Sequence, residues 1–400
     1  MSDQPLNKHR VSVDRRDFLK KASIWIAAGG STATAAALVT RVYGSAVGGA
    51  RPTNDTFVPR GAIYIPARAW NAYQIWQSYD AQIIRRDIGY AKSLRLNALR
   101  VWLSYEFWLA DSAALLQRFD HFLHTCGAAG IKVMPVLFEG DGVEPTPRHI
   151  ADTHPLTASD LLSPASQIVN NPRRWHRPIK FLDWFLKRFS NDRRLLAIEV
   201  QNEPWGEPRH RFAEAMMRHA AHRRGAVQLS IGGANISQSM AYLNAGADIL
   251  QTHPDFPAST AALHKVLHDI HRAQRTLGKP VWLTEWQRIR TGGSGWGNQR
   301  LTGNEWEPDY ASMAPLIRGS GVGNFFWSLM LKPAWLLAQR RKGTLNGVFH
   351  ENGAVWSLAD ARAISGNPHF QAIERKAWPR WAEIIPESLG MKASQGAAHK

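Results

Sequence analysis

The sequence predicts an α/β fold in which eight parallel strands alternate with helices and close into a (β/α)8 TIM barrel. From about residue 60 onward, short β-branched or apolar runs alternate with longer segments whose apolar residues recur every three or four positions. Eight such repeats in roughly 340 residues fit the unit count and the size of that barrel. The apolar fraction of 44% and the charged fraction of 20% are typical of a soluble globular chain.

The expected elements follow this alternation in chain order. Strands are predicted at residues 62–65, 97–102, 131–138, 195–201, 227–232, 247–252, 280–284 and 323–328. Helices are predicted at 80–94, 113–129, 179–189, 207–222, 238–246, 259–277, 309–317 and 358–384, the last with breaks near Gly366 and Pro379. Two connections are long, at 139–175 and 287–307, and loops that follow barrel strands gather on the catalytic face.

A doubly wound open sheet is the alternative fold. Its usual signature is a glycine-rich phosphate loop directly after the first strand, and this chain has none there. The glycine-rich run at 319–323 leads into a strand rather than out of one. The single cysteine, Cys126, excludes an intrachain disulfide and a cysteine-based zinc cluster. We therefore predict neither a cofactor nor a metal.

The first fifty residues resemble a twin-arginine export signal. Arg15 and Arg16 precede Phe18-Leu19-Lys20 and a mildly apolar stretch at 22–39. The stretch approaches the ~20-residue length that spans a membrane, so a retained anchor is the alternative. We expect residues 1–50 to be a signal and short linker, and residues 51–400 to be one barrel domain. The expected partner is the twin-arginine machinery, with a periplasmic or secreted mature protein that has no stable membrane span.

The chain is strongly basic, with a formal net charge of +17. A basic balance by itself sets solubility and non-specific attraction to anions rather than a fold or a function. The sequence carries no RNA-binding aromatic-basic motif and no finger spacing, so we predict no specific nucleic-acid partner. A protein that binds an anionic polymer without catalysing a reaction stays open as a hypothesis.

Two predicted strands end in a glutamate. The run at 195–201 leads into Asn202-Glu203-Pro204, and the run at 280–284 leads into Glu285. The carboxyl ends of parallel strands meet at one mouth of a barrel, so the two carboxylates can converge. Such a pair suits glycoside hydrolysis, because one group protonates the leaving oxygen while the other attacks the anomeric carbon. For either glutamate alone, a surface salt bridge is the more ordinary reading.

These residues resemble those of the family-5 glycoside hydrolases, the cellulase and mannanase family of clan A. The resemblance runs from about residue 61 to 327. It implies that Glu203 is the acid/base and Glu285 the nucleophile. It further matches four supporting residues to family positions on strands two, four, six and eight: Arg100, Asn202, His253 and Trp327.

The chain departs from the family in two places. The family usually has a histidine near the end of strand three, where this chain reads Val136-Leu137-Phe138-Glu139. It also usually has a tyrosine two residues after the strand-six histidine, and Asp255 stands there. Phe256 cannot supply the hydrogen bond of that tyrosine. We expect Glu139 to be a solvated loop acid.

Each candidate site residue has a possible catalytic or substrate-binding role and a purely structural alternative. Glu203 needs a raised pKa to act as an acid, whereas a nearby Arg100 could keep Glu285 ionised or simply make a structural ion pair. Asn202 could hydrogen-bond a sugar 2-hydroxyl, His253 could orient the site or be a structural histidine, and Trp327 could stack on a pyranose or pack in the core. For Trp205, Trp286, Trp296 and Trp306 on the post-strand loops, packing is favoured over sugar binding.

The sequence therefore predicts an exported retaining β-glycosidase. Its expected partner is a β-linked polysaccharide or oligosaccharide, cleaved by double displacement at O-glycosidic bonds. The alternative is a carbohydrate-binding barrel that has lost catalysis, which the missing tyrosine keeps open.

Overall fold

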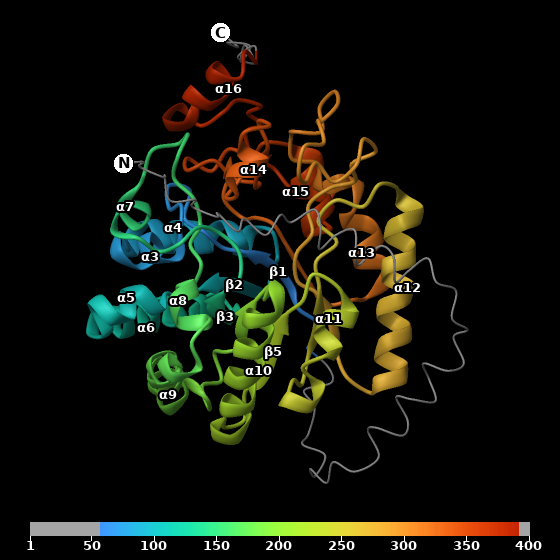
Figure 1. The fold of residues 1–400 in the computed structure, drawn as a ribbon. Coiled ribbons are helices and arrows are strands. Elements are labelled where there is room, and N and C mark those ends of the chain that lie inside the picture. The colour runs from blue at the N-terminus through green and yellow to red at the C-terminus, as the bar shows by residue number, and fades with distance from the viewer. Residues whose placement is uncertain (1–56, 392–400) are drawn as a thin grey trace, which may run out of the picture. The chain divides into compact units, whose positions relative to one another are not determined.

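Eight parallel strands with helices between them form the predicted (β/α)8 barrel (Figure 1). The computed structural model describes residues 57–391, so the predicted export segment lies outside the described residues. The strands pair in the order β5-β4-β3-β2-β1-β8-β7-β6, and a parallel bridge between Ser230 and Ile249 links the two ends. The strands are β1 Arg60–Ile63, β2 Ala98–Trp102, β3 Lys132–Glu139, β4 Ala197–Asn202, β5 Gln228–Gly232, β6 Leu250–Thr252, β7 Val281–Leu283 and β8 Asn324–Phe326.

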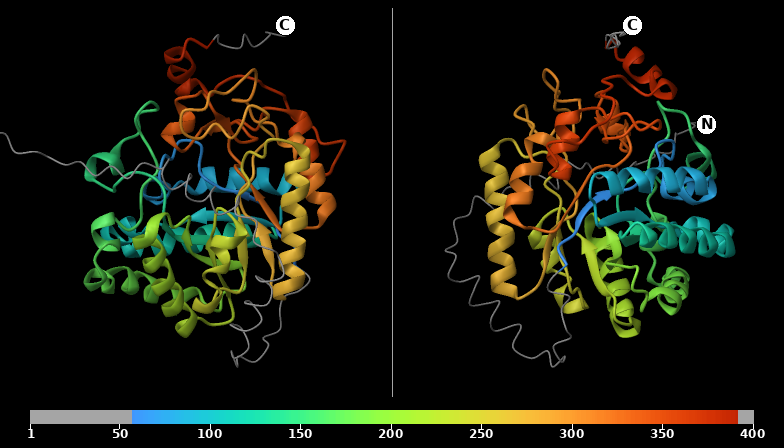
Figure 2. Two further views of the ribbon diagram at one scale, coloured as in Figure 1. Left: turned by 45° about the vertical axis from the view of Figure 1, so that its right-hand side comes forward. Right: turned by 180° about the vertical axis from the view of Figure 1, so that it is seen from behind.

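Helices surround the strands, as the two further views in Figure 2 show. The main connecting helices are α4 Ala81–Ser93, α6 Ser112–Ala128, α9 His176–Phe189, α10 Gly206–Arg223, α12 Thr260–Leu277 and α13 Ala314–Ser320. Their boundaries follow from capping chemistry. Asp80 accepts hydrogen bonds from the second and third amides of α4, Ser259 caps α12, and Gly278 ends α12 in the left-handed conformation (φ 60°).

Shorter elements fill the connections. The helices are α3 Ala72–Gln77, α5 Tyr105–Ala110, α7 Pro147–Ala151, α8 Ser166–Val169, α11 Ile236–Met240, α14 Leu337–Arg340, α15 Leu358–Ser365 and α16 Ile384–Ser388. Single 3-10 turns occur at Pro172–Arg174, Leu243–Ala245, Tyr310–Ser312 and Arg380–Ala382. After β8, the two-residue strands β9 Lys332–Pro333 and β10 Leu345–Asn346 pair as a small antiparallel hairpin.

The barrel interior is divided into an apolar floor and a polar mouth. The floor is one buried cluster contributed by six strands or strand flanks: Ala98, Met134, Ala197, Ile249, Trp282 and Phe325. Gly61 on β1 leaves the space for this packing, because a Cβ there would lie 2.4 Å from the Phe325 ring. Since side chains alternate along a strand, the residues two positions beyond Ala98 and Ala197 also point inward. Those residues are Arg100 and Glu199, and they begin the polar mouth.

All eight strands and most helices lie where the sequence predicts them. The region predicted as one broken helix at 358–384 contains α15, which ends at Ser365 with Gly366 as its left-handed cap. Within residues 57–391, no helix combines the length and the apolar character needed to cross a membrane.

Candidate active site

Arg100 organises the polar mouth of the barrel from β2. Its side chain is fully buried and forms a bidentate pair with Glu199, with both N–O distances at 2.7 Å. It also donates to Glu285 Oε1 and to Asn202 Oδ1, each at 2.7 Å. A planar guanidinium with five donors suits this fourfold task. Arg100 therefore fixes β4 and the end of β7 relative to each other.

Glu203 follows β4 in an unusual backbone conformation. Its φ is 34°, in the left-handed region that residues other than glycine rarely adopt. Its amide donates to the Gly232 carbonyl at 2.9 Å, which ties it to the end of β5. Gly140 lies against it so closely that a Cβ there would be 1.9 Å from the Glu203 carbonyl oxygen. Packing on both sides thus imposes this backbone, as is common where a site needs one side-chain direction.

His253 lies between the two candidate catalytic carboxyls. Its Nδ1 is hydrogen-bonded to Glu203 Oε1 at 2.8 Å and lies 3.7 Å from Glu285 Oε1, while its Nε2 is bonded to Thr284 Oγ1 at 2.9 Å. One oxygen of Glu203, one nitrogen of His253 and one oxygen of Glu285 all lie within 4.8 Å of one another. Burial lowers the pKa of His253, but the adjacent Glu285 and Glu203 outweigh burial and leave this pKa raised.

Glu285 carries opposing influences on its ionisation. Burial raises the pKa of its carboxyl, whereas the positive charges of His253 and Arg100 lower it, and the net shift is upward. The predicted contact of Arg100 with Glu285 is present. Without the positive charge of Arg100, the pKa of Glu285 would lie higher still. Glu203 Oε2 accepts a hydrogen bond from Trp205 Nε1 at 3.2 Å, so this indole supports the site rather than facing solvent alone.

Glu139 is a buried part of the site, which corrects the expectation of a solvated loop acid. It is the last residue of β3 and is 5% exposed. The long loop folds back over it through two backbone hydrogen bonds with Ser163. Trp102 Nε1 donates to Glu139 Oε2 at 2.6 Å, and Asn202 Nδ2 donates to both of its oxygens at 3.1 Å. Burial, with Asp160 adding to it, raises the pKa of Glu139 well above its usual range.

Trp327 lies at the mouth, half-buried between two other indoles. The Trp102 ring meets it edge-on at 5.7 Å and the Trp335 ring at 6.3 Å. Its Nε1 donates to the side-chain oxygen of Asn346 at 3.1 Å, and the amide of Asn346 donates to Gln287 Oε1 at 2.9 Å. The three indoles form an aromatic wall beside the carboxylates.

Asp255 completes the chain of polar contacts that starts at Trp327. Gln287 Nε2 donates to Asp255 Oδ1 at 3.1 Å, and the Asp255 carbonyl accepts the amides of Gln287 and Arg288. Burial of the carboxyl and the negative charge of Glu285 raise the pKa of Asp255 to about 8.

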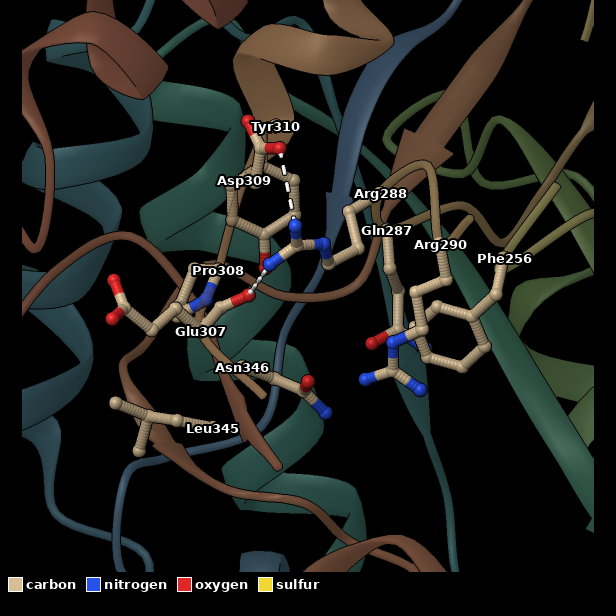
Figure 3. A pocket seen from close by; sticks show the side chains of 10 residues that line it. All are labelled: Phe256, Gln287, Arg288, Arg290, Glu307, Pro308, Asp309, Tyr310, Leu345 and Asn346. Carbon is tan, nitrogen blue, oxygen red and sulfur yellow. Dashed lines mark hydrogen bonds and ion pairs between the residues drawn. The ribbon is translucent and has the colours of Figure 1, made fainter. Parts of the chain in front are cut away.

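A small pocket lined in part by Asn346 and Gln287 lies between the connection after β7 and the β9–β10 hairpin (Figure 3). Its two arginines have structural partners. Arg288 donates to the carbonyls of Asn304 and Glu307, and the Arg290 guanidinium lies 3.6 Å from the Phe256 ring centroid while donating to the Glu305 carbonyl. These contacts fix the long connection against the rim of the site.

The trio of Glu203, His253 and Glu285 has the donor types that could bind a cation. Both ring nitrogens of His253 already have hydrogen-bond partners, and the Arg100 guanidinium contacts Glu285 directly. A cation would have to displace these contacts and approach the buried positive charge of Arg100. The arrangement therefore fits two carboxyls held for acid/base work better than a metal centre.

Comparisons with solved structures place this architecture among known enzymes. The exo-β-1,4-mannosidase from Opitutaceae bacterium strain TAV5 matches 78% of this chain with a TM-score of 0.56 and 16% identity, and this chain spans only 59% of that protein. The family-5 mannosidase from Rhizomucor miehei matches with a TM-score of 0.53 and 13% identity, over 78% of this chain and 92% of that one. The chain has the family-5 glycoside hydrolase fold. The resemblance predicted from the sequence is thereby confirmed at the level of the fold.

A further structure extends the same likeness. The GH5_18 protein from Streptomyces cattleya, solved in complex with GlcNAc, matches with a TM-score of 0.56 and 13% identity, over 80% of this chain and 84% of that one. No sequence-family description and no curated protein matches the chain. At these identities the likeness covers the fold, and the chemistry has to be argued from the side chains.

Within the family-5 fold, the structure brings together the six residues that the sequence singles out: Arg100, Asn202, Glu203, His253, Glu285 and Trp327. Sequence reasoning missed Glu199 and Thr284 and misjudged Glu139. Glu199 could have been identified from the sequence, because it is a charged residue inside an apolar strand. It lies two positions after Ala197, so both side chains point into the barrel. Three of the four loop tryptophans pack against aromatic rings as expected: Trp286 against Tyr310, Trp296 against Phe256 and Trp306 against Trp378.

Proposed function

We propose that this protein is an exported retaining β-glycosidase that hydrolyses O-glycosidic bonds of a β-linked polysaccharide or oligosaccharide by double displacement. The observation that carries the proposal is the spacing of Glu203 and Glu285 around His253, with oxygens of the two carboxyls within 4.8 Å. Retaining pairs have carboxyl groups about 5–5.5 Å apart, whereas inverting pairs lie about 6.5–9.5 Å apart to admit a water. The short spacing supports retention.

The two carboxyls take different roles because their partners differ. Glu285 is held by Arg100, and a carboxylate paired with a cation can attack the anomeric carbon to form a glycosyl-enzyme. Glu203 gives its proton to the departing oxygen as the glycosidic bond breaks. It then takes a proton from the water that cleaves the glycosyl-enzyme, releasing Glu285. Its contact with His253 holds it in reach of both steps.

A β-linked mannose polymer or oligomer is the first substrate class to test. Several solved neighbours are named mannosidases or mannanases. Trp327 is the indole of this wall that is partly exposed, and it suits the apolar face of a pyranose because indole faces stack on sugar rings; the buried Trp102 and Trp335 hold it in place. Glucans and acidic glycans belong in the same panel, because nothing in the wall selects between sugar epimers.

The test is turnover of a β-glycan panel by the wild type, Glu285→Ala and Glu203→Ala. We expect Glu285→Ala to lose at least about a thousandfold in activity, since the covalent step is gone. Glu203→Ala should retain formation of the glycosyl-enzyme on substrates with activated leaving groups. Added azide should restore its turnover and yield the β-glycosyl azide, since azide needs no general base.

The outcomes separate enzyme from binder. A wild type that binds glycans but cleaves none would support the alternative of a carbohydrate-binding barrel. Cleavage that neither alanine variant changes would place the chemistry elsewhere in the protein.

A further inference from the structure

Glu139 is a buried carboxyl at the barrel mouth that the proposed double displacement does not use. Its Oε1 accepts the Asp141 amide at 2.9 Å, and its Oε2 accepts the Trp102 indole N–H at 2.6 Å. Asn202 Nδ2 donates to both oxygens at 3.1 Å. All of these partners are donors, so they are satisfied together only by a group that accepts on both of its oxygens. The hydrogen bonds from Asp141 and Asn202 oppose the effect of burial, which raises the pKa of this carboxyl.

The backbone of Glu139 is held from two sides. Its amide and its carbonyl both pair with Ser163 of the long loop after β3. Arg209 from α10 is buried and donates to the carbonyls of Glu139 and Pro164, each at 3.2 Å. Glu139 is therefore a fixed acceptor at the end of β3.

The amide of Asn202 has one orientation that satisfies its neighbours. Its Oδ1 accepts from Arg100 at 2.7 Å, and a guanidinium has donors alone. Its Nδ2 faces the two oxygens of Glu139. Turning the amide over would set its N–H groups against Arg100 and its oxygen against the carboxyl, so both hydrogen bonds would be lost. Arg100 and Glu139 together fix the amide.

One N–H of this amide remains for a ligand. The two oxygens of a carboxyl lie side by side, so a single N–H of Asn202 can be shared between them in a three-centre bond. The second N–H makes no further hydrogen bond within residues 57–391. Asn202 directly precedes Glu203 and shares the Arg100 guanidinium with Glu285. The amide thus lies beside both candidate catalytic carboxyls, and carbon 2 of a bound sugar adjoins the anomeric carbon between them.

We propose that Glu139 is a positioning residue, which fixes the Asn202 amide so that its second N–H donates to the 2-hydroxyl of the sugar being cleaved. The inference rests on the proposed function, because it needs a sugar at the two carboxyls. A hydrogen bond to the 2-hydroxyl strengthens in the transition state, so its direction matters most as the glycosidic bond breaks. Glu139 acts on the sugar only through Asn202.

The test compares two substrates that differ in the 2-hydroxyl alone. One is the dinitrophenyl β-mannoside or β-glucoside, whichever the wild type cleaves, and the other is the dinitrophenyl 2-deoxy-β-arabino-hexopyranoside, which is the 2-deoxy form of both. We expect Glu139→Gln to lower kcat/KM by about ten- to a hundredfold on the 2-hydroxy substrate and by less than about threefold on the 2-deoxy substrate. Glutamine has the same shape, but its NH2 group faces a donor.

Asn202→Ala should show the same selectivity, because it removes the group through which Glu139 acts. In an Asn202→Ala background, Glu139→Gln should then change kcat/KM by less than about threefold, since the two residues belong to one interaction. Fully additive losses in the double variant would overturn the proposal.

Glu106→Gln is the matched control, because it makes the same change from acid to amide beside the same loop. Glu106 Oε2 accepts the Ser163 hydroxyl at 2.8 Å, and a glutamine oxygen can accept it as well. We expect this variant to keep the wild-type preference for the 2-hydroxy substrate. Loss of that preference would show that the loop, rather than the contact with Asn202, sets it.

A second measurement needs no substrate. NMR of protein carrying isotope-labelled asparagine shows the side-chain amide of Asn202, which is assigned by its absence in Asn202→Ala. A hydrogen bond to a carboxyl moves one of the two amide protons downfield. We expect Glu139→Gln to remove this displacement and Glu106→Gln to retain it, while the other asparagine signals show that both variants are folded.

The results distinguish this role from the proposed function. Equal losses of Glu139→Gln on both substrates, or an unchanged Asn202 signal in that variant, would overturn the positioning role and leave the glycosidase intact. A wild type that cleaves neither these substrates nor any glycan of the panel would overturn the proposed function, and with it the role of the 2-hydroxyl. The Asn202 signal would still decide whether Glu139 orients the amide.

Discussion

Glu203 owes its position to neighbours that have no part in the chemistry. Its left-handed φ of 34° costs an L-residue of order 1–3 kcal/mol, so the conformation persists only where packing enforces it. Gly140 makes that packing possible, since its missing Cβ lets the end of β3 lie directly on the Glu203 carbonyl. A residue that the sequence shows only as one more glycine after Glu139 therefore helps set the direction of the Glu203 side chain, the proposed acid/base.

Substitution of Gly140 should consequently act on activity through position. A Cβ placed 1.9 Å from the Glu203 carbonyl oxygen forces the backbone apart. A misplacement of about 1 Å near the reacting atoms can cost about a hundredfold. We expect Gly140→Ala to lower kcat on a cleaved β-glycan by about that factor and to reduce the melting temperature.

Gly89→Ala is the matched control for this prediction. Gly89 lies inside α4, and a Cβ there would meet nothing within 4 Å. Alanine should raise stability by up to about 1 kcal/mol and leave kcat unchanged. Unchanged kcat in Gly140→Ala would show that Glu203 tolerates the displaced backbone.

At the scale of elements, α15 illustrates how a connection is attached to the barrel. Asp360 in α15 is buried, and its Oδ1 accepts the Ala311 amide of the 3-10 turn at Tyr310–Ser312. That turn carries Tyr310, whose hydroxyl accepts the amides of Ser328 and Gly347. Through Tyr310, this one carboxyl thus supports the backbone directly after Trp327 and the backbone at Gly347.

The ionisation of Asp360 gives a pH-dependent stability with a definite sign. Burial raises the pKa of Asp360 to about 7 in the folded protein, while the unfolded value is near ~3.9. Between these values the unfolded chain loses the proton and the folded protein keeps it, so rising pH reduces wild-type stability. Asp360→Asn cannot titrate. Its free energy of unfolding relative to wild type should therefore rise from pH 4 to 7, by at most about 4 kcal/mol, and stay level above pH 7.

Urea denaturation of both proteins across this pH range measures the difference. Asp269→Asn serves as a control of opposite sign. Burial raises the pKa of Asp269, but Lys265 and Arg272 together outweigh burial and leave this pKa lowered. Removing Asp269 should thus cost a little stability at neutral pH and nothing in acid. A pH-independent difference for Asp360→Asn would mean that this group has the same pKa in both states.

The strands were predictable because parallel strands buried on both faces are apolar runs, which stand out from amphipathic helices. The β9–β10 hairpin was not predictable, since two-residue strands such as Lys332–Pro333 have no periodicity. Glu203 and Glu285 could be found because they directly follow such runs. The burial of Glu139 could not be predicted, because it depends on the long loop after β3, which folds back so that Ser163 pairs with Glu139.

At the scale of the whole molecule, the described barrel accounts for residues 57–391, and the sequence before it carries a separate hypothesis. The chain has 49 basic and 32 acidic residues. A basic surface can bind an anionic polymer without catalysing a reaction. Added salt should weaken such electrostatic binding, whereas it should have little effect on a sugar stacked in the site. The proposed export would bring the proposed glycosidase to carbohydrate outside the cytoplasm.

Export by the twin-arginine route is a prediction about Arg15 and Arg16. Replacing both with lysine keeps the charge and the length of the segment but removes the pair that the pathway reads. We expect the double variant to accumulate in the cytoplasm with its apolar stretch intact, while the wild type appears in the periplasm or medium. Cell fractionation with an antibody to the barrel domain measures this distribution.

Lys8→Arg with Lys21→Arg is the matched control, since it makes an equally conservative double change in the same segment and leaves both the arginine pair and Phe18-Leu19-Lys20 untouched. This variant should be exported like the wild type. The length of the exported chain decides between cleavage and anchoring, because a retained apolar stretch would leave the full-length protein in the membrane fraction. Normal export of the Arg15→Lys, Arg16→Lys variant would refute the twin-arginine reading, and the barrel with its two carboxyls would then have to reach its substrate by another route.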